Sequence, residues 1–351
     1  MIDYLIVGSG IAGICFSEFA LNKGKKIVVF ENYSQPSSKI AGGLYNPVVL
    51  KRFSEVWKAK EQLELALPFY AKIENKLGIK FDYKIPIYRK LASVEEQNNW
   101  FQAADKVNLS DFLSTNIIPN RYSSVNSSFG FGEVFHTGYL DVKCLVDAYE
   151  VFLKENNLIK NELFDYDKIE FFDDYILYNN YKVKSIIFAE GFGLHANPFF
   201  NELPLDGTKG ELLVIKSKDL KVDVTIKSSV FILPIGDDKY KVGATYDWSD
   251  KTNQPTEAGR NELIEKLEEV INCEYEIIEH FGGVRPTVKD RRPLVGTHHQ
   301  YANLHVLNGL GTRGVMLAPF LANQLFDFIE NGTPLDKEID IKRIYKKKNI
   351  I

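Results

Sequence analysis

Three glycines near the N-terminus have the spacing of a phosphate-binding loop. Gly8, Gly10 and Gly13 lie between an apolar stretch, Asp3–Val7, and an apolar helical run. In such a unit the first glycine makes a tight turn, the second lets the backbone approach a pyrophosphate, and the third lets helix and strand pack closely. Glu31 follows the next predicted strand, where a carboxylate accepts hydrogen bonds from ribose hydroxyls and repels a 2′-phosphate. The pattern predicts a bound dinucleotide other than NADP; the alternative is a glycine-rich turn within a core unit.

A second glycine-rich turn lies near the other end of the chain. Gly309-Leu310-Gly311-Thr312-Arg313-Gly314 separates an apolar strand from an apolar helix over Val315–Ile329. A nicotinamide enzyme needs one such loop, whereas FAD has a second polar group to bind. Reduced isoalloxazine carries negative charge near N1 and the C2 carbonyl, and the N–H groups of a helix N-terminus stabilise such charge. The turn therefore favours FAD over NAD; the alternative is a left-handed turn that leads into a packing helix.

Further small residues follow predicted strands and loops. The segment Ala41–Leu44 would let the backbone lie against a flat ring, and the apolar strand Val183–Ala189 ends in a turn at Gly191. The predicted cofactor-binding residues occupy these turns and the strand ends beside them: Gly8, Gly10, Ile11, Ala12, Gly13, Glu31, Asn32, Ala41, Gly42, Gly43, Leu44, Ile169, Ala189, Gly191, Gly309, Gly311, Thr312, Arg313, Gly314 and Val315.

These turns need strands and helices to position them, and the pattern of the chain predicts an α/β protein with two interleaved domains. An amphipathic helix is expected over Val56–Leu77, interrupted near Pro68, and residues 208–282 have the alternation of an antiparallel sheet. The predicted FAD-binding domain is Rossmann-like and discontinuous, and comprises residues 1–80, 136–205 and 283–345. The predicted substrate domain is smaller, of α+β type, and comprises residues 81–135 and 206–282.

Composition excludes several classes of protein. The chain has 351 residues, 45% of them hydrophobic, and a net charge of −4, so it has no general attraction to nucleic acid or anionic membrane. No apolar run approaches the length of a transmembrane helix, and a cytoplasmic location is expected. Cys15, Cys144 and Cys273 lack metal or redox spacing, we expect the first two to be buried, and no metal site is predicted. The basic tail Lys342–Lys348 is expected to be a frayed, solvated terminus; the alternative is a contact with an RNA backbone.

Short motifs in a fixed order along nearly the whole chain are similar to those of the FAD-dependent D-amino-acid oxidase superfamily, which includes glycine oxidase and sarcosine oxidase. The matching pieces are Gly8–Gly13 with Glu31, Ser38–Pro47, Gly138–Asp141, Ile187–Gly191, Leu203–Leu205 with Lys209-Gly210, Pro234 with Val242–Thr245, Gly283–Thr287 with Asp290, Pro293 and Gly296, and Gly309–Pro319. Two stretches, Gly42–Tyr45 and Gly309–Val315, most resemble the FAD oxidoreductase part of the bifunctional enzymes that modify the tRNA wobble uridine. The resemblance implies a FAD-binding domain of the glutathione-reductase type.

The resemblance also implies roles for individual residues. It assigns Arg285 to the substrate carboxylate, which a guanidinium can bind with two hydrogen bonds. It places Arg313 beside the flavin turn, where it would contact substrate or flavin or cap the loop. Phe231 replaces a tyrosine whose hydroxyl often assists carboxylate binding in the superfamily, so the second donor could be Tyr246, which could equally be a packing residue. The cysteines lie outside the loop that attaches flavin covalently in some members, and His298 and His299 are expected to face solvent. The implied cofactor is therefore non-covalent FAD.

The function implied is oxidation of the C–N bond of a glycine-like or N-substituted glycine amine, with hydride transfer to flavin N5. One alternative is oxidation of carboxymethylaminomethyl-uridine in tRNA, which the two wobble-uridine stretches favour and the net charge disfavours. Another is a FAD-binding protein without amine oxidase activity, which Phe231 would suit. A small-molecule substrate is the expected partner, tRNA is a weaker candidate, and the exact amine, the electron acceptor and the oligomeric state stay open.

Overall fold

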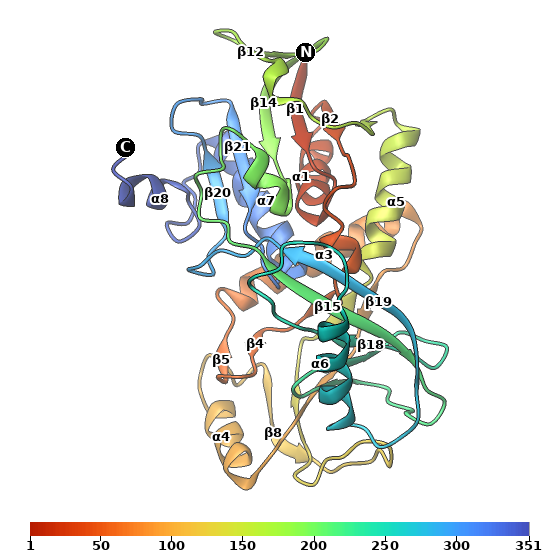
Figure 1. Ribbon diagram of the computed structural model, residues 1–351. Coiled ribbons are helices and arrows are strands. Elements are labelled where there is room, and N and C mark those ends of the chain that lie inside the picture. The colour runs from red at the N-terminus through yellow and green to blue at the C-terminus, as the bar shows by residue number, and fades with distance from the viewer. Residues whose placement is uncertain (351) are drawn as a thin grey trace.

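The apolar runs near the two ends of the chain form strands of one sheet, with one strand between them, in the computed structural model, which describes residues 1–350 (Figure 1). Five strands are parallel, in the order β11, β2, β1, β14, β21. Their bounds are β1 Ile2–Val7, β2 Ile27–Phe30, β11 Ile159–Lys160, β14 Tyr181–Phe188 and β21 Leu304–Asn308. Strands buried on both faces read as continuous apolar runs, which explains why β2, the second half of β1 and the second half of β14 show no alternation.

Antiparallel strands complete this sheet. β12 (Ile169–Phe171), β13 (Ile176–Tyr178) and the first part of β14 form a meander that follows a short 3₁₀ turn, η1 (Tyr166–Lys168). On the far side β20 (Leu294–Thr297) pairs antiparallel with β21. A parallel sheet with such a meander is the Rossmann-like arrangement of the glutathione-reductase type, as predicted.

Helices cover one face of the sheet. They are α1 (Ile11–Asn22), α3 (Ala59–Leu77), α5 (Val142–Glu155) and α7 (Gly314–Asn331), and they share one apolar core with the inward side chains of β1. The predicted interruption of α3 at Pro68 is wrong. The proline is exposed, so the carbonyl whose hydrogen bond it removes can reach water, and the helix continues through it.

The opposite face of the sheet is covered by the meander, by the 3₁₀ helix η2 (Gly191–Ala196) with its following loop, and by α8 (Lys342–Lys347). The basic tail is therefore not frayed. Tyr345 is fully buried in this second core, which orders α8 although most of its lysines are exposed. Cys15 is buried as predicted, but Cys144 is only half-buried because it lies on the outer side of α5.

A second, mostly antiparallel sheet forms the other half of the molecule, in the order β19, β15, β18, β17, β16, β7, β9, β8 (Figure 1). Its strands are β7 Ile87–Lys90, β8 Leu113–Ile118, β9 Phe131–Val134, β15 Thr208–Lys216, β16 Thr225–Lys227, β17 Phe231–Pro234, β18 Lys239–Gly243 and β19 Glu276–Arg285. Only the central pair β16–β7 is parallel. The helix α6 (Glu257–Glu268), which the side chain of Thr256 caps, packs on one face of this sheet.

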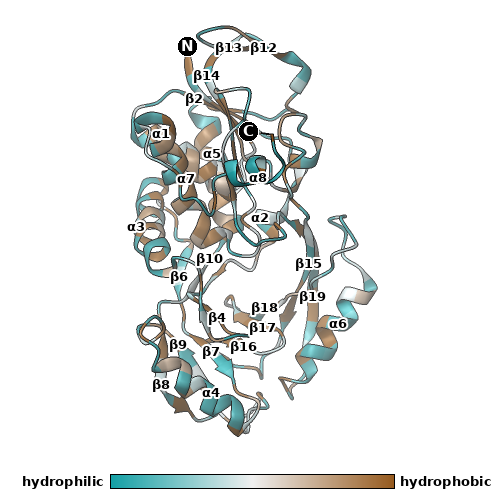
Figure 2. Cartoon of the chain, turned by 90° about the vertical axis from the view of Figure 1, so that its left-hand side faces the viewer, coloured by the Kyte–Doolittle hydropathy of each residue, from teal (hydrophilic) through white to brown (hydrophobic). Residues whose placement is uncertain are grey.

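Short elements join the two halves. Figure 2 shows β6 and β10 between them, and β3 completes that three-stranded sheet. The remaining elements have these bounds: α2 Ser37–Ile40, β3 Leu44–Tyr45, β4 Val48–Val49, β5 Ser54–Glu55, β6 Asp82–Lys84, α4 Val94–Ala104 and β10 Gly138–Leu140.

The predicted domain limits stay a prediction. The strands of the two large sheets fall on either side of these limits, except that β19 runs across the limit at residue 282. β6, from the predicted substrate domain, pairs with β10 of the predicted FAD-binding domain. Within residues 1–350, no helix combines the length and apolar character needed to cross a membrane.

Candidate functional site

The first glycine-rich turn joins β1 to α1 with very little space. Gly8 has a φ of +100°, and a Cβ there would lie 2.5 Å from the carbonyl oxygen of Ala189 at the end of β14. A Cβ at Gly13 would lie 1.9 Å from the carbonyl oxygen of Gly8. Both positions therefore require glycine, for a left-handed turn in one case and for helix–strand contact in the other.

The polar groups of this turn fit a phosphate-bearing ligand. Gly10 is the N-cap of α1 and has no side chain to occupy the helix N-terminus, which leaves that terminus available to an anion. Ser9 is buried, and its hydroxyl has no hydrogen-bond partner among the described residues. Ser38 contributes a hydroxyl that accepts from the N–H of Ile11 at 3.2 Å. A buried, unpartnered hydroxyl beside a helix N-terminus that its own N-cap residue leaves uncapped suits the pyrophosphate of FAD.

Glu31 lies beside the same turn. Its carboxylate accepts hydrogen bonds from the backbone N–H groups of Ser9 and Tyr33, both at 2.6 Å. The acidic group is therefore held next to the loop, where the sequence predicts a carboxylate that binds the ribose hydroxyls. Asn32 is exposed, and its side chain accepts from the N–H of Ser34 at 3.0 Å.

The second glycine-rich turn lies next to the first. A Cβ at Gly314, the first residue of α7, would lie 3.5 Å from a methyl group of Ile11 in α1. Gly309 and Gly311 have φ angles of +75° and +57°, and the N–H of Gly311 donates to the carbonyl of Pro286 at 2.9 Å. The N-cap residue of α7 makes no side-chain cap, so this helix N-terminus is also free of a capping side chain. The structure thus brings together two helix N-termini whose N-cap residues provide no capping side chain.

The other residues at this end of α7 differ in exposure. Thr312 is exposed, and Val315 is buried, with its carbonyl accepting from Tyr70 at 2.7 Å. Arg313 is half-buried, and burial, together with Arg292 and Arg291, lowers its pKa. Arg313 forms no ion pair within residues 1–350, so its cation remains available to a bound anion.

The segment Ala41–Leu44 lies between the two halves. A Cβ at Gly42 would lie 2.7 Å from the ring of Phe231 in β17, and one at Gly43 would lie 1.9 Å from the carbonyl oxygen of Leu140. These contacts place the segment against the second sheet, on the face opposite α6. Phe231 is buried in a small apolar cluster with Leu233.

The remaining predicted cofactor residues lie near the end of β14. Ala189 is buried, and Gly191 has a φ of +57° and accepts from Asn308 at 2.9 Å. Between them is Glu190, which accepts from Asn197 and Tyr166, and whose pKa burial raises to about 7. Ile169 is half-buried in β12, three residues after Tyr166. No contact described above joins Ile169 to the glycine-rich turns.

Arg285 ends β19 and extends across β15. A Cβ at Gly210 would lie 1.8 Å from its Nη2 atom, so the guanidinium occupies the space that a side chain at 210 would take. Its Nη1 donates to the carbonyls of Thr245, at 3.2 Å, and Lys209, at 3.4 Å. Arg285 forms no ion pair with a carboxylate within residues 1–350, and burial lowers its pKa. A half-buried, unpaired guanidinium is a site for an anion.

Tyr246 lies beneath this guanidinium. The Cζ of Arg285 is 4.7 Å from the centre of the Tyr246 ring, a cation–π distance. Tyr246 is 61% exposed, and its ring is the surface on which the guanidinium stacks. The structure brings Arg285 and Tyr246 together, and their role toward a substrate stays a prediction.

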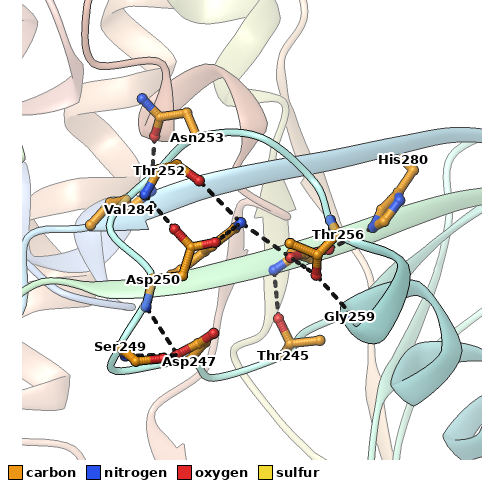
Figure 3. Close-up of polar contacts among 12 residues, drawn as sticks. Thr245, Asp247, Ser249, Asp250, Thr252, Asn253, Thr256, Gly259, His280 and Val284 are labelled. Carbon is orange, nitrogen blue, oxygen red and sulfur yellow. Dashed lines mark hydrogen bonds and ion pairs between the residues drawn. The ribbon is translucent and has the colours of Figure 1, made fainter.

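The loop that carries Tyr246 is held by a buried polar cluster (Figure 3). Lys209 in β15 is fully buried, and its ammonium bonds to Asp250 at 2.5 Å and lies 3.4 Å from Glu211. Glu211 also accepts from the hydroxyl of Thr256 at 2.9 Å and contacts the Nε2 of His280 at 2.8 Å. Lys209 and Glu211 thus hold the loop at Asp250 and Thr256. The loop in turn holds Tyr246 against Arg285.

Sequence reasoning missed this cluster, although it quoted Lys209-Gly210 as a motif. Alternate residues of a strand share a face, so the pairing of Lys209 with Glu211 was predictable, but their partners lie between 41 and 69 residues away along the chain. It also placed His298 in solvent, and this is wrong. His298 is buried against Phe200, and burial and His299 lower its pKa to about 4. Glu202 brings a possible third metal ligand to this histidine pair, with the three ligand atoms within 4.8 Å of one another.

A surface cavity of about 400 Å³ lies at the edge of the first sheet, between Ile2, Leu21 and Leu158. None of the predicted site residues lines it, so the candidate site remains the region of the two glycine-rich turns and Arg285.

Comparison with known proteins agrees with this geometry. The family described as FAD dependent oxidoreductase matches residues 3–327. The bifunctional tRNA 5-methylaminomethyl-2-thiouridine biosynthesis protein MnmC of Marinobacter nauticus is 21% identical over 98% of this chain and 59% of its own length. Glycine oxidase of Bacillus subtilis is 24% identical over 45% of each chain. The present chain thus spans about half of these curated relatives.

The fold has close counterparts among solved structures. Glycine oxidase from Bacillus cereus superposes with a TM-score of 0.78 over 95% of this chain and 96% of its own, at 18% identity. Together with the family match over most of the chain, this shows that the protein belongs to the FAD-dependent oxidoreductases of the D-amino-acid oxidase superfamily.

Proposed function

We propose that the protein oxidises the C–N bond of glycine or an N-substituted glycine. The observation that carries the proposal is Arg285, whose guanidinium is half-buried, stacked on Tyr246 and without a carboxylate partner within residues 1–350. A planar guanidinium binds a carboxylate through two parallel hydrogen bonds and so fixes the orientation of the α-carbon. Relatives that are named glycine oxidases support this choice of substrate.

The proposed cofactor is FAD, bound without a covalent link. The first glycine-rich turn with Glu31 would hold the adenosine diphosphate part, and the turn before α7 would hold the isoalloxazine. When bound, FAD accepts a hydride at N5. Of the three cysteines, Cys15 is fully enclosed in the core of α1, which suits a packing role rather than attachment to flavin.

The protein's own residues bind and orient the substrate. Arg285 would hold the carboxylate while the platform of Tyr246 prevents the guanidinium from turning away. The α-carbon of the neutral amine loses a hydride with its two electrons, and a C=N⁺ bond forms. Water then adds to this bond and releases glyoxylate and the amine of the N-substituent. The neutral amine needs no side-chain base, and the electron acceptor that restores the oxidised cofactor is oxygen or another oxidant.

Anaerobic reduction of the purified flavoprotein tests the proposal. Glycine, sarcosine, D-amino acids, proline and carboxymethylaminomethyl-tRNA are mixed with the protein, and the loss of flavin absorption is followed. We expect glycine or an N-substituted glycine to bleach the flavin. Arg285→Ala is expected to lower kcat/KM by a factor of about ten to a hundred or more, because a hydrogen-bonded ion pair contributes about 1.5–3 kcal/mol. If no amine bleaches the wild type, amine oxidation is wrong and a FAD-binding protein of another activity is favoured. If amines bleach the wild type and Arg285→Ala equally well, Arg285 does not bind the substrate carboxylate.

A second candidate is oxidation of the carboxymethylaminomethyl group of a tRNA wobble uridine. It is favoured by the relative that aligns over 98% of this chain and is named for tRNA modification. The reacting group is itself an N-substituted glycine, so Arg285 would bind it in the same way. Bleaching by modified tRNA without bleaching by any free amine would select this candidate; bleaching by free amines alone would reject it.

A further inference from the structure

One face of the second sheet carries a row of register partners. Lys227 in β16 pairs with Phe231 in β17, Phe231 pairs with Gly243 in β18, and Gly243 pairs with Leu212 in β15. Directly paired residues on neighbouring strands project to the same face. Because Phe231 contacts Gly42, this is the face turned toward the predicted flavin-binding segment, and α6 covers the opposite one.

Arg285 belongs to the same face. It pairs with Thr208, which lies four residues before Leu212 on β15, and residues an even number apart on a strand share a face. Four strand steps separate β19 from β16, and Thr208 lies four residues from Leu212 along β15, so the backbones of Arg285 and Lys227 are about 23 Å apart at the usual spacings. The guanidinium of Arg285 extends over Gly210 toward Thr245. The distance from the guanidinium to Lys227 is therefore shorter than the distance between the two backbones.

Lys227 is a half-buried cation without a counter-ion. Within residues 1–350 it forms no ion pair, and its ammonium lies 5.7 Å from the centre of the Phe231 ring. The charges near it are the cations Arg89 and Lys266, and with burial they lower its pKa to about 8. Arg89 is already paired with Glu96, at 2.7 Å, and Lys266 with Glu262, at 2.5 Å.

Another lysine on this face provides a contrast. Burial also lowers the pKa of Lys241 in β18, but the carboxylates of Asp141 and Glu279 act on it in the opposite direction. Lys227 has no such neighbour. Keeping a cation away from water without a partner is costly, whereas an arriving anion would remove that cost. The sheet face therefore has one anion site at Arg285 and a second at Lys227, with the Phe231 ring beside the second.

We propose that Lys227 binds a second acidic group of the substrate, so that the preferred substrates are N-substituted glycines whose substituent ends in a carboxylate. This inference rests on the proposed amine oxidation, in which Arg285 binds the glycine carboxylate. The Phe231 ring would contact the methylene groups of the substituent, which explains why a phenyl ring without a hydroxyl occupies that position. The span between the two cations favours a substituent of several carbons.

Non-oxidisable ligands test the subsite without turnover. In thioethers, sulfur replaces the amine nitrogen, and binding to the oxidised holoenzyme is measured by the change in flavin spectrum and by calorimetry. (Methylthio)acetate has one carboxylate, whereas 3-(carboxymethylthio)propanoate and 4-(carboxymethylthio)butanoate have two. We expect at least one diacid to bind the wild type about tenfold more tightly than the monoacid, in line with one additional charged hydrogen bond. Equal affinity for monoacid and diacids in the wild type would overturn the subsite without any variant.

Variants assign the second anion site to Lys227. Lys227→Met should remove the preference for the diacid and leave the Kd of the monoacid unchanged, and Lys227→Arg should keep most of the preference. Lys216→Met, the same change at an exposed position of β15, should have no effect. If Lys227→Met weakens monoacid and diacid equally, its role is structural and the proposal is wrong.

The corresponding amines separate failure of the subsite from failure of the proposed function. With N-(2-carboxyethyl)glycine and N-(3-carboxypropyl)glycine as substrates, Lys227→Met should raise KM about tenfold with little change in kcat, since the charged hydrogen bond is made equally in the bound substrate and during reaction. Sarcosine kinetics should not change. Flavin reduction by sarcosine without any preference for these diacids would overturn the subsite and leave amine oxidation intact. Absence of reduction by every amine, with a diacid preference that depends on Lys227, would instead overturn amine oxidation.

Discussion

At the scale of single residues, the candidate site depends on positions where a side chain is missing. Gly210 leaves the space in which the guanidinium of Arg285 lies, and Gly42 leaves the space that the ring of Phe231 approaches. Neither glycine has a positive φ, so both are set by close contact rather than by backbone conformation. The shape of the candidate site thus depends on the absence of a side chain at these two glycines as well as on the arginine.

Gly210→Ala tests this arrangement. A methyl group 1.8 Å from Nη2 must displace the guanidinium, so we expect kcat/KM for the amine substrate to fall by about tenfold or more, the loss of about one charged hydrogen bond. Flavin content should stay that of the wild type. Gly193→Ala, where a Cβ would make only an ordinary 3.5 Å contact with Gln35, is the matched control. Unchanged kinetics in Gly210→Ala would show that the arginine does not need this space.

Residue-level prediction from the sequence succeeded where a local motif carried the information. Gly8 and Gly13 are conspicuous in the chain, and their tight contacts follow from spacing alone. Lys227 carried no such signal, because a lysine in a short strand is usually solvated, and its lack of a counter-ion depends on which strands pair around it. The unpartnered hydroxyl of Ser9 was hidden in the same way.

At the scale of elements, the end of β14 contains a carboxyl group whose protonation is coupled to folding. Burial raises the pKa of Glu190 to about 7, although hydrogen bonds from Asn197 and Tyr166 act in the opposite direction. The ordinary pKa of a glutamate is about 4.3, so the folded protein holds this proton more tightly than the unfolded chain does. The stabilisation is complete below pH of about 4 and is lost as the pH rises through 7.

Glu190→Gln should therefore flatten the dependence of stability on pH. We expect the free energy of unfolding of the wild type, relative to the variant, to fall by on the order of 3 kcal/mol between pH 4 and pH 8. Denaturant unfolding of both proteins at several pH values measures the difference. His298 and His305, whose burial lowers their pKa to about 4 and about 3, titrate in both proteins and cancel in the comparison. Parallel pH profiles would contradict the prediction.

The elements themselves were largely predictable, and their misplaced limits have identifiable causes. The hairpin of β17 and β18 and the cap of α6 follow from turn and capping residues that act locally. Pro68 did not break α3, because an exposed proline lets its neighbours find water while the buried face of the helix keeps its contacts. Tertiary burial overrode the local signal there, as it did for His298.

At the scale of the whole molecule, the C-terminal tail closes the second face of the first sheet. Its composition predicted a solvated end, but Tyr345 and Ile344 anchor it in the core. Lys346 and Lys347 remain exposed. Charge alone did not reveal this, because the two apolar side chains that decide the packing are surrounded by five basic residues.

Tyr345→Ala should consequently lower the free energy of unfolding by about 3–5 kcal/mol, the usual cost of removing a large buried aromatic side chain. The double variant Lys346→Glu/Lys347→Glu changes only exposed charges and should melt close to the wild type. Thermal melts of the three proteins at one FAD concentration make the comparison. Equal melting temperatures for Tyr345→Ala and the wild type would mean that the tail does not contribute to the core in solution.

One connection between the halves has a mechanical consequence. Arg285 is followed directly by Pro286, whose carbonyl receives the N–H of Gly311 from the turn before α7. The proposed substrate anchor and the proposed flavin turn are therefore coupled mechanically through one peptide bond and one hydrogen bond. Phe231 and Lys227 lie on β17 and β16, three and four strand steps away from Arg285. We expect substitutions at these two positions to change which amine is accepted more than the distance across which the hydride travels.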